Sequence, residues 1–477
     1  MRSHLQTIRP YLDFVKTLFG HLADESNRHG VPPDVLAKDY LSDRGRQQEF
    51  SKHIGQITGQ INKFWQVNGP WLRGHLRQMP GLKAGLAGDM GPQPSDHVFE
   101  RAGLYFDTII VYDPLVHAAT LPSEFLLNQD YYLIKYGIIQ CQLRDLYLAE
   151  TTPPIAYLLG DPGMLAGPSV TGPEPFELAW LDTVMLVNEL YDTDFDSFSE
   201  VTQYFERFAS NEEAVRNLAR PEMFVFNPYV DKNPEAQWSF AQEQLAKDIW
   251  PNSRMVQGSR ASLVSLVISG RMGQAVDILQ RTVQQGFHPL VAAPASYHWL
   301  IQKIRLNQRH VSKELGIDFS TLATTNALLK QKNAWLGNVT LEQLVKLRQR
   351  NELGDLRAEL NRNFDVLAGA SLDTLDSRVI QVDQNLNSAL IRHSEQIKEL
   401  DQRLLSSLGI TGPSLLISIF AALEPTIGTI LPNWIPGVVG VTSLKELIRV
   451  FVEYSRGRRA LSKSPIGVLW AAKKKDG

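Results

Sequence analysis

A seam of apolar side chains toward the C-terminal end of the chain constrains its fold most. Leu372, Leu375, Val379, Val382 and Leu386 follow the alternating three- and four-residue spacing of a helix with one buried face. The seam then continues at Leu390, His393, Ile397, Leu400 and Leu404. A helix over 371–406 would be roughly 50 Å long. Such a helix needs a partner along its apolar face.

The segment before this helix offers one such partner. Thr340 and Gln343 form a capping box that begins a helix, apolar residues recur at helical spacing as far as Leu367, and Gly369 ends the helix. The short turn at Gly369 favours an antiparallel helical hairpin, and the alternative is pairing with another subunit. We therefore expect contacts with another protein, or with a second copy of this chain, through the helices of 341–404.

The segment after the helix is apolar, is interrupted by proline and glycine, and ends in a basic tail. Only ten residues lie between Pro413 and Glu424, whereas a helix that crosses a membrane needs about 20 apolar residues. We interpret the segment as part of the protein's own core, and the alternative is contact with an anionic membrane. The residues that would make this contact are Leu415, Ile419, Phe420, Trp434, Lys473, Lys474 and Lys475.

Length and charge limit the class of protein and its partners. A chain of 477 residues with 43% hydrophobic residues is expected to form several substructures with their own cores. The formal net charge of −3 is not that of a chain built as a whole for nucleic acid or an anionic surface. A single cysteine, Cys141, and charged residues within the N-terminal apolar pattern favour a cytoplasmic protein, with a peripheral membrane location as the alternative.

Periodicity and composition together predict a fold that is mainly α and multi-part, with a few short strands in the central region and a long C-terminal helical hairpin. The glycines of the interval 79–105 are interpreted as a connector, because no Gly-Lys-Ser or Gly-Lys-Thr follows them to make a phosphate-binding loop. The predicted parts are an N-terminal helical segment at 1–78, a linker rich in glycine and proline at 79–105, a central mixed but mostly helical domain at 106–335, the hairpin at 336–408, and the apolar segment with its basic tail at 409–477.

Three short apolar runs in the central part each stop at an acid or amide followed by proline. They span 106–112, 155–159 and 224–226. Aromatic and β-branched residues favour a strand in the first run and, more weakly, in the third.

Asp107, Asp113 and Asp161 lie in or beside the first two of these runs. Carboxylates that converge from neighbouring strands could hold Mg²⁺ for hydrolysis, which makes these residues the candidate catalytic acids. The favoured interpretation is structural, because an Asp-Pro pair suits the first turn of a helix. The sequence therefore predicts no metal site and no cofactor.

A second group of acids resembles half of a calcium-binding loop. Asp192, Asp194 and Asp196 have the right spacing, but Ser197 and Gln203 stand where an EF-hand loop needs glycine and a bidentate acid. We interpret Ser197 and Glu200 as a capping box that begins a helix.

The residues 311–329 have the spacing of a helix-turn-helix, with Gly316 at the turn. Two packed helices give the same pattern, and the second helix, which would read the bases, has no arginine or lysine before Lys330, so nucleic acid is not the favoured partner. The candidate DNA-binding residues are Arg305, Arg309, Lys313, Thr321, Thr324 and Asn326.

The sequence favours a non-enzymatic interaction or scaffold component, in a bacterial multiprotein system, that acts through protein–protein contacts. Three alternatives stay open: a membrane-associated effector that uses 409–441 and the basic tail, a DNA-binding protein, and a hydrolase that depends on a divalent metal.

Overall fold

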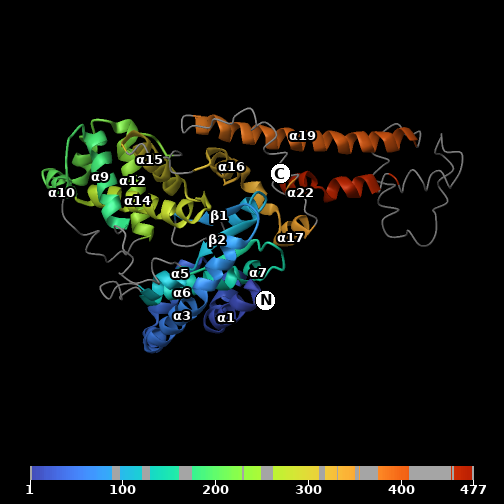
Figure 1. The fold of residues 1–477 in the computed structure, drawn as a ribbon, viewed down its shortest axis with the longest axis horizontal. Coiled ribbons are helices and arrows are strands. Elements are labelled where there is room, and N and C mark those ends of the chain that lie inside the picture. The colour runs from blue at the N-terminus through green and yellow to red at the C-terminus, as the bar shows by residue number, and fades with distance from the viewer. Residues whose placement is uncertain are drawn as a thin grey trace. The chain divides into compact units, whose positions relative to one another are not determined.

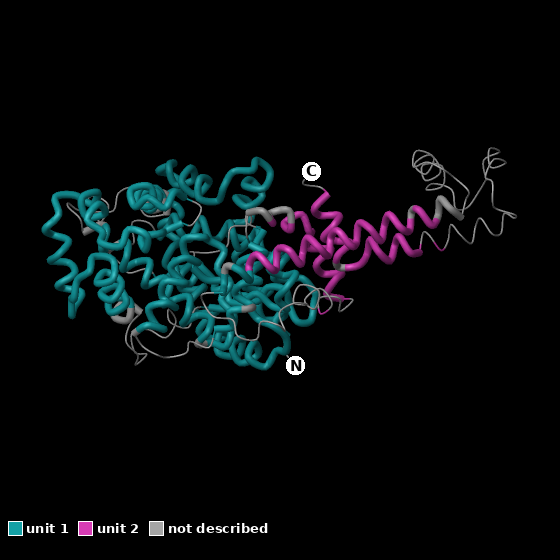
Figure 2. The backbone as a smooth tube through the Cα atoms, turned by 90° about the horizontal axis from the view of Figure 1, so that it is seen from above, with its two compact units in different colours: residues 1–329, 369–378 teal, residues 330–368, 379–477 magenta. Residues whose placement is uncertain are grey.

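The chain is described by a computed structural model that is mainly helical and contains a small parallel sheet, as the sequence predicts (Figure 1). Its elements form two compact units, 1–329 with 369–378, and 330–368 with 379–477 (Figure 2). The residues that the structure describes are 3–88, 97–120, 129–160, 175–227, 230–248, 262–310, 317–329, 331–349, 354, 374–407, 453 and 456–474.

The first unit begins with three helices, α1 (His4–His29), α2 (Pro33–Ser42) and α3 (Arg44–Gln78). A capping box of Ser3 and Gln6 begins α1, and Gly30 ends it in the left-handed conformation at φ 64°. An apolar seam with alternating four- and three-residue spacing runs along α3 through Phe50, Ile54, Ile57, Ile61 and Phe64. Ile57 and Ile61 are buried, whereas the other three are partly exposed. The seam therefore enters the core only in the second half of the helix.

Four parallel strands make one sheet in the order β3-β2-β1-β4. They are β1 (Lys83–Leu86), β2 (Thr108–Tyr112), β3 (Ala156–Leu159) and β4 (His288–Leu290). In register, Ala84 of β1 lies beside Ile109 of β2 on one side and beside His288 of β4 on the other. The two inner strands are β1 and β2.

The sheet corrects the strand predictions in three places. β1 forms within the interval that the sequence predicts as a linker, and the run 155–159 supplies β3 although its composition did not favour a strand. The run 224–226 forms no strand. Phe224 and Phe226 are instead buried in a core between helices.

The segments that connect the strands are helical. α4 (Val98–Ala102) lies between β1 and β2, and α5 (Pro114–Thr120), α6 (Gln129–Gln142) and α7 (Arg144–Tyr147) lie between β2 and β3. The N-terminal helices pack against this group, with α1 and α2 on α6 and α3 on α5. α16 (Phe319–Leu329) packs on α4 and on β4.

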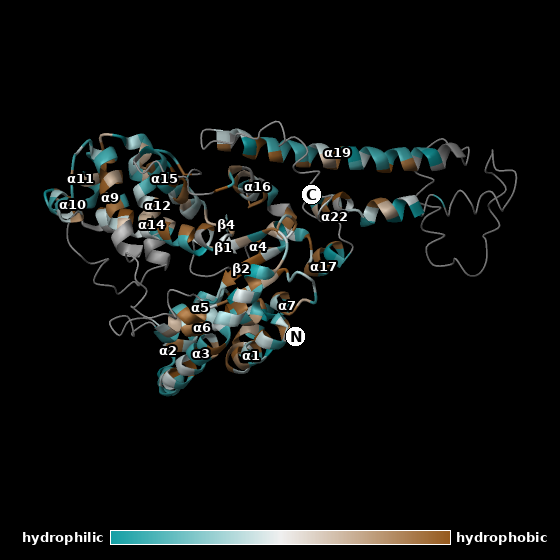
Figure 3. Ribbon diagram, viewed as in Figure 1, coloured by the Kyte–Doolittle hydropathy of each residue, from teal (hydrophilic) through white to brown (hydrophobic). Residues whose placement is uncertain are grey.

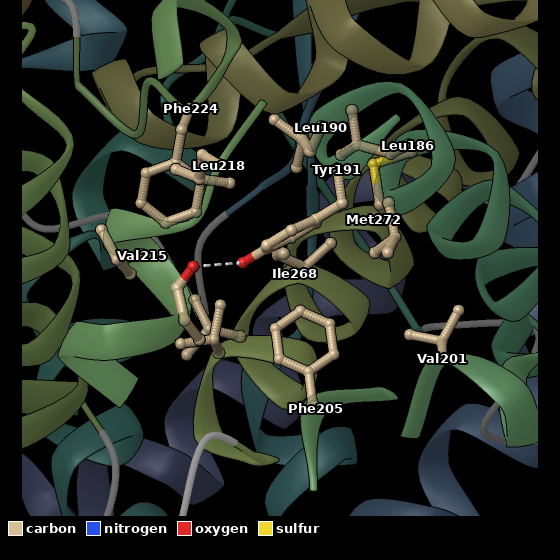
Figure 4. Packing of buried hydrophobic residues seen from close by; sticks show 14 of the residues in the cluster. Leu186, Leu190, Tyr191, Val201, Phe205, Val215, Leu218, Phe224, Ile268 and Met272 are labelled. Carbon is tan, nitrogen blue, oxygen red and sulfur yellow. Dashed lines mark hydrogen bonds between the residues drawn. The ribbon is translucent and has the colours of Figure 1, made fainter. Parts of the chain in front are cut away.

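The residues between β3 and β4, together with the helix that follows β4, build a helical core (Figure 4). At its centre the Tyr191 hydroxyl donates a 2.9 Å hydrogen bond to the backbone oxygen of Ala214. Ser197 and Ser210 cap two of its helices, which confirms Ser197 as the predicted N-cap, although Glu200 Oε2 accepts from the backbone nitrogen of Asp196 rather than from that of Ser197. Its elements are α9 (Pro175–Tyr191), α10 (Phe198–Phe205), α11 (Asn211–Arg216), η4 (Pro221–Met223), α12 (Pro234–Asp248), α14 (Ser262–Arg281), η5 (Val283–Gln285) and α15 (Pro294–His310).

The second unit is helical and contains the predicted C-terminal hairpin. Its described helices are η6 (Gln331–Asn338), α17 (Leu341–Gln349), α19 (Leu375–Ser407), the helical residues 456–463, and α22 (Pro465–Lys474). The predicted capping box of Thr340 and Gln343 precedes α17. Most of 350–373, where the sequence predicts the rest of the first hairpin arm and its turn, lies outside the described residues.

The long helix α19 runs antiparallel to the residues 456–474. The His393 ring lies 5.8 Å from that of Trp470, and Lys473 Nζ donates a 3.1 Å hydrogen bond to Asn387 Oδ1. A side chain built at Gly457 would contact Leu400, so the pairing extends over much of the helix. Apolar and polar residues alternate along α19 (Figure 3). Val379 and Val382, which belong to the predicted seam, are buried.

Candidate functional site

Asp113 follows β2 directly and occupies the best-defined polar site among the candidate residues. Its side chain is only 2% exposed. The backbone nitrogen of Leu115 donates a 3.0 Å hydrogen bond to Asp113 Oδ1, and α5 begins at Pro114. This is the helix start that an Asp-Pro pair favours, with the acid at the cap and proline at the first helical position.

Three further donors from three different helices reach the same carboxylate. The Tyr11 hydroxyl of α1 and Trp65 Nε1 of α3, the latter at 2.8 Å, donate to Oδ2. Gln140 Nε2 of α6 donates to Oδ1 at 3.2 Å. Burial raises the pKa of Asp113 to about 6, and the hydrogen bonds oppose that rise. Both oxygens are thus occupied by protein donors, which makes Asp113 a junction of helices on β2 rather than an open ligand.

Close packing around this junction depends on two glycines. A Cβ atom at Gly137 of α6 would overlap the ring of Phe19 on α1. A Cβ atom at Gly160, which follows β3, would lie 2.7 Å from Trp65 Cδ2. The missing side chains let α1 and α3 approach closely enough for Tyr11 and Trp65 to reach Asp113.

The predicted grouping of acids is wrong for Asp107 and Asp113. Asp107 precedes β2, and its Oδ2 accepts a 2.7 Å hydrogen bond from the backbone nitrogen of Leu82. The two acids therefore lie at opposite ends of β2, roughly 20 Å apart, and cannot bind one metal ion. Asp161 lies outside the described residues. Within the part of the chain that the structure describes, no group of three or more His, Cys, Asp or Glu is placed to hold a metal ion.

The structure also corrects the predicted DNA-reading helix. Thr321 and Thr324 of α16 are 4% and 0% exposed, because this face of the helix packs on α4 and β4. Buried hydroxyl groups cannot reach the edges of bases. Asn326 is partly buried, Arg305 is exposed, and Lys313 lies outside the described residues.

The other basic candidate of this region is engaged within the fold. Arg309 Nη1 lies 2.5 Å from Glu189 Oε2 of α9, and deeper between the same helices Lys303 Nζ lies 2.5 Å from Asp182 Oδ1. These two ion pairs join α15 to α9. Lys303 and Arg309, two of the cations near the predicted turn, therefore make structural contacts within the fold.

Most of the candidate membrane contacts lie outside the described residues, namely Leu415, Ile419, Phe420, Trp434 and Lys475. Lys473 bonds Asn387, and Lys474 Nζ lies 4.2 Å from the centre of the Trp470 ring. Among the described helices, none is long and apolar enough to cross a membrane.

A further feature of α19 does not follow from the predicted seam. On the side opposite its buried residues, uncharged side chains recur every three or four residues at Ser377, Ile380, Gln384, Asn387, Ile391 and Ser394. We call this set the α19 stripe. Ile380 and Ile391 are 52% and 59% exposed, although both are large and apolar. The signal was present in the sequence as a second heptad spacing, but only the structure shows that this side of the helix is exposed.

A second buried polar cluster lies on β3 and was also missed. The His4 ring of α1 stacks on Tyr157 at 4.0 Å, and neither of its nitrogens has a hydrogen-bond partner. The Tyr157 hydroxyl donates to the Leu72 oxygen at 2.8 Å and lies 3.2 Å from His75 Nδ1, so His75 donates through that nitrogen. Burial, assisted by the nearby His75, lowers the pKa of His4 to about 4.

Comparison of the chain with protein-family models, with curated proteins and with solved structures gives no match. A functional proposal therefore depends on the residues described above.

Proposed function

We propose that this protein is a non-enzymatic interaction component that assembles with a second copy of itself through the α19 stripe. The observation that carries the proposal is the exposure of Ile380 and Ile391 on one face of a 33-residue helix whose other face is already buried. Eleven residues separate them, which is about three helical turns, so both point the same way.

The order of residues along the stripe favours a second copy over an unrelated helix. Read in either direction, the stripe gives the same order of hydroxyl, isoleucine, amide, amide, isoleucine and hydroxyl. In an antiparallel pair centred between Gln384 and Asn387, each Ile380 therefore meets Ile391 of the second copy. A two-fold symmetric contact requires a surface that complements itself in this way.

The amides at the centre also match. Lys473 already donates to Asn387 Oδ1, which leaves the Asn387 amide nitrogen as a donor toward the Gln384 side-chain oxygen of the second copy. The residues of the stripe themselves carry no charge from Ser377 to Ser394, and the one cation at its centre, Lys473 of the neighbouring helix, is hydrogen-bonded to Asn387.

The strength of this contact follows from the area that it would bury. Each of the four isoleucines is about half exposed, so its burial contributes about 1 kcal/mol. Together they give about 4 kcal/mol, from which the cost of the translational and rotational freedom lost on association is subtracted. The stripe alone therefore supports a transient pair, and covalent trapping is the appropriate measurement.

Disulfide trapping tests both the contact and its direction. Ile380→Cys and Ile391→Cys are prepared with tags of different mass, mixed and oxidised. The antiparallel pair predicts that the mixed disulfide forms faster than either homotypic disulfide, because identical positions lie about 16 Å apart. Cys141 does not interfere, since burial raises the pKa of its thiol to about 12.

A matched control comes from the same helix. Gln396→Cys is also exposed but faces away from the stripe, so it should cross-link at the rate of random collision. Homotypic links at Ile380→Cys that outpace the mixed product would show a parallel pair instead. Links that form no faster than those of Gln396→Cys would rule out the stripe as a contact surface.

The residues 456–474 support a second candidate function, binding to an anionic membrane surface. This stretch has six basic residues and no acid: Arg456, Arg458, Arg459, Lys463, Lys473 and Lys474. Basic residues near an anionic bilayer contribute about 1 kcal/mol each. Flotation with phosphatidylcholine vesicles, with and without phosphatidylserine, tests it. The candidate is supported if retention needs phosphatidylserine and is lost in Arg456→Glu with Arg459→Glu, and is excluded if retention is equal on both vesicles.

A further inference from the structure

Two large apolar side chains are exposed side by side on α9, a helix that otherwise packs into the core of Figure 4. Trp180 is 44% exposed and Leu181 is 57% exposed. The next two residues, Asp182 and Thr183, are 2% and 0% exposed. Exposed neighbours of this size at the edge of a core are the kind of patch that marks an interaction site.

The Trp180 indole is held in place by an aromatic partner. Its ring stacks on that of Phe198, the first residue of α10, with ring centres 5.7 Å apart and planes 10° from parallel. Phe198 itself packs against the core. The outer part of the indole is therefore a rigid apolar surface that faces solvent, and a ligand that stacks on it would not need to order the side chain first.

Several carboxylates lie close to Phe198 along the chain. Asp194, Asp196 and Glu200 are exposed and lie within four residues of Phe198 along the chain. Glu200 Oε2 accepts a 2.9 Å hydrogen bond from the backbone nitrogen of Asp196, which positions the Glu200 carboxylate at the start of α10. From Asp192 to Glu206 the sequence has five acids and no lysine or arginine. The segment that contains Phe198 is thus locally acidic.

We propose that Trp180, Leu181 and Phe198, with the carboxylates of Asp194 and Asp196, form a docking surface for a cationic peptide segment in which arginine alternates with apolar residues. A guanidinium group that stacks on the indole can also form a salt bridge with one of these carboxylates. The adjacent apolar side chain of the peptide covers Leu181. Nucleic acids and anionic lipids are excluded as occupants, because their phosphates would meet these carboxylates.

Arginine suits this site better than lysine. The planar guanidinium can stack on a ring and donate from its edge simultaneously, whereas the ammonium group of lysine is a compact and strongly hydrated charge. The surface therefore predicts a preference between two peptides of the same length and charge.

Fluorescence anisotropy of labelled peptides with the full chain tests the proposal. The probe alternates arginine with leucine, and the comparison peptides replace every arginine with lysine or with glutamate. We expect the arginine peptide to bind most tightly, the lysine peptide several-fold more weakly, and the glutamate peptide not to bind. Affinity for the arginine peptide should fall as salt is raised.

Variants locate the binding on the chain. Trp180→Ala should weaken the arginine peptide about tenfold, and Asp194→Asn with Asp196→Asn should weaken it by a similar factor. Leu181→Ser provides a second test that leaves the stacked ring pair intact and should weaken binding less. The controls are Asp145→Asn, an exposed acid on α7, and Val67→Ala, an exposed apolar residue on α3; neither should change the affinity.

The proposal is overturned if the arginine peptide binds the Trp180→Ala, Leu181→Ser and double-aspartate variants as tightly as the unmodified chain, or if the glutamate peptide binds equally well. Disulfide trapping on α19 does not depend on these variants. The peptide-binding proposal can therefore be overturned while the proposed self-association stands, and the self-association can be overturned while peptide binding stands.

Discussion

The Trp65 indole nitrogen donates a 2.8 Å hydrogen bond to Asp113 Oδ2, and so joins the middle of α3 to the end of β2. The Tyr11 hydroxyl donates to the same oxygen from α1. One carboxylate that is 48 residues from Trp65 and 102 residues from Tyr11 in sequence therefore holds two N-terminal helices on the sheet. The stability of the first unit should depend strongly on this acid.

Asp113→Asn should lower the free energy of unfolding by about 2 to 4 kcal/mol. All four partners donate to Asp113, so the amide nitrogen of asparagine would face a fixed N–H donor in either orientation, Leu115 N at the Oδ1 position or Trp65 Nε1 at the Oδ2 position. Urea denaturation measures the change. Asp145→Asn, an exposed acid, should change the free energy of unfolding by less than about 0.5 kcal/mol; a loss as small at Asp113 would show that it is not a junction.

Glycine to alanine should have opposite effects on two helices. At Gly137 the added methyl group would overlap the Phe19 ring, so we expect a loss of about 1 to 3 kcal/mol. At Gly74 of α3 the methyl group meets nothing within 4 Å, so the better helix propensity of alanine should stabilise the protein by up to about 1 kcal/mol. Thermal unfolding followed by circular dichroism distinguishes the two signs.

Removing one partner of the buried ion pair between α9 and α15 should be costly. Asp182 and Lys303 have side chains that are 3% and 12% exposed, so Lys303→Met leaves a buried acid without its cation. We expect a loss of about 3 to 5 kcal/mol. Adding Asp182→Leu should restore much of that loss, because the double variant buries no charge. A double variant less stable than Lys303→Met would contradict this account.

Acidification should destabilise the fold through two buried histidines. Burial lowers the pKa of His4 and of His298 to about 4, from 6.5 in an unfolded chain. Each therefore contributes stability that is complete above pH 6.5 and is lost as the pH falls toward 4, by about 3 kcal/mol. Asp113 acts in the opposite direction, because its raised pKa of about 6 makes the folded state gain stability from pH 6 down to 3.8.

His4→Phe isolates one contribution to this pH dependence. Phenylalanine keeps the stacking on Tyr157 but cannot be protonated, so the decline in stability between pH 6.5 and 4 should become shallower. Unfolding free energies measured by urea denaturation across that range provide the readout. An unchanged slope would mean that His4 is not neutral in the folded state.

Local signals gave correct predictions of several elements. The N-cap at Ser197, the capping box at Thr340 and the helix start at Asp113-Pro114 depend on residues within one turn of each other. The seam of α19 was also correct, because a spacing of three and four residues needs no knowledge of what packs on it.

The errors arose where a residue's environment is set by distant segments. Lys83–Leu86 has no β-branched residue, yet it forms a strand because β2 and β4 pair with it on both sides. Thr321 and Thr324 looked available to bases, but α4 and β4 cover them. The junction at Asp113 was missed for the same reason, since Tyr11, Trp65 and Gln140 come from three separate helices.

The position of β4 in the sheet has a consequence for synthesis of the chain. Ala84 of β1 pairs with His288 of β4, 204 residues later. At roughly 5 to 20 residues per second, the ribosome needs about 10 to 40 s to make the intervening chain. During that time one edge of β1 has no strand beside it, which exposes a template for association between nascent chains. Pulse-labelling of chains truncated before residue 288 should therefore find them bound to chaperones, whereas chains that extend past 290 should be released.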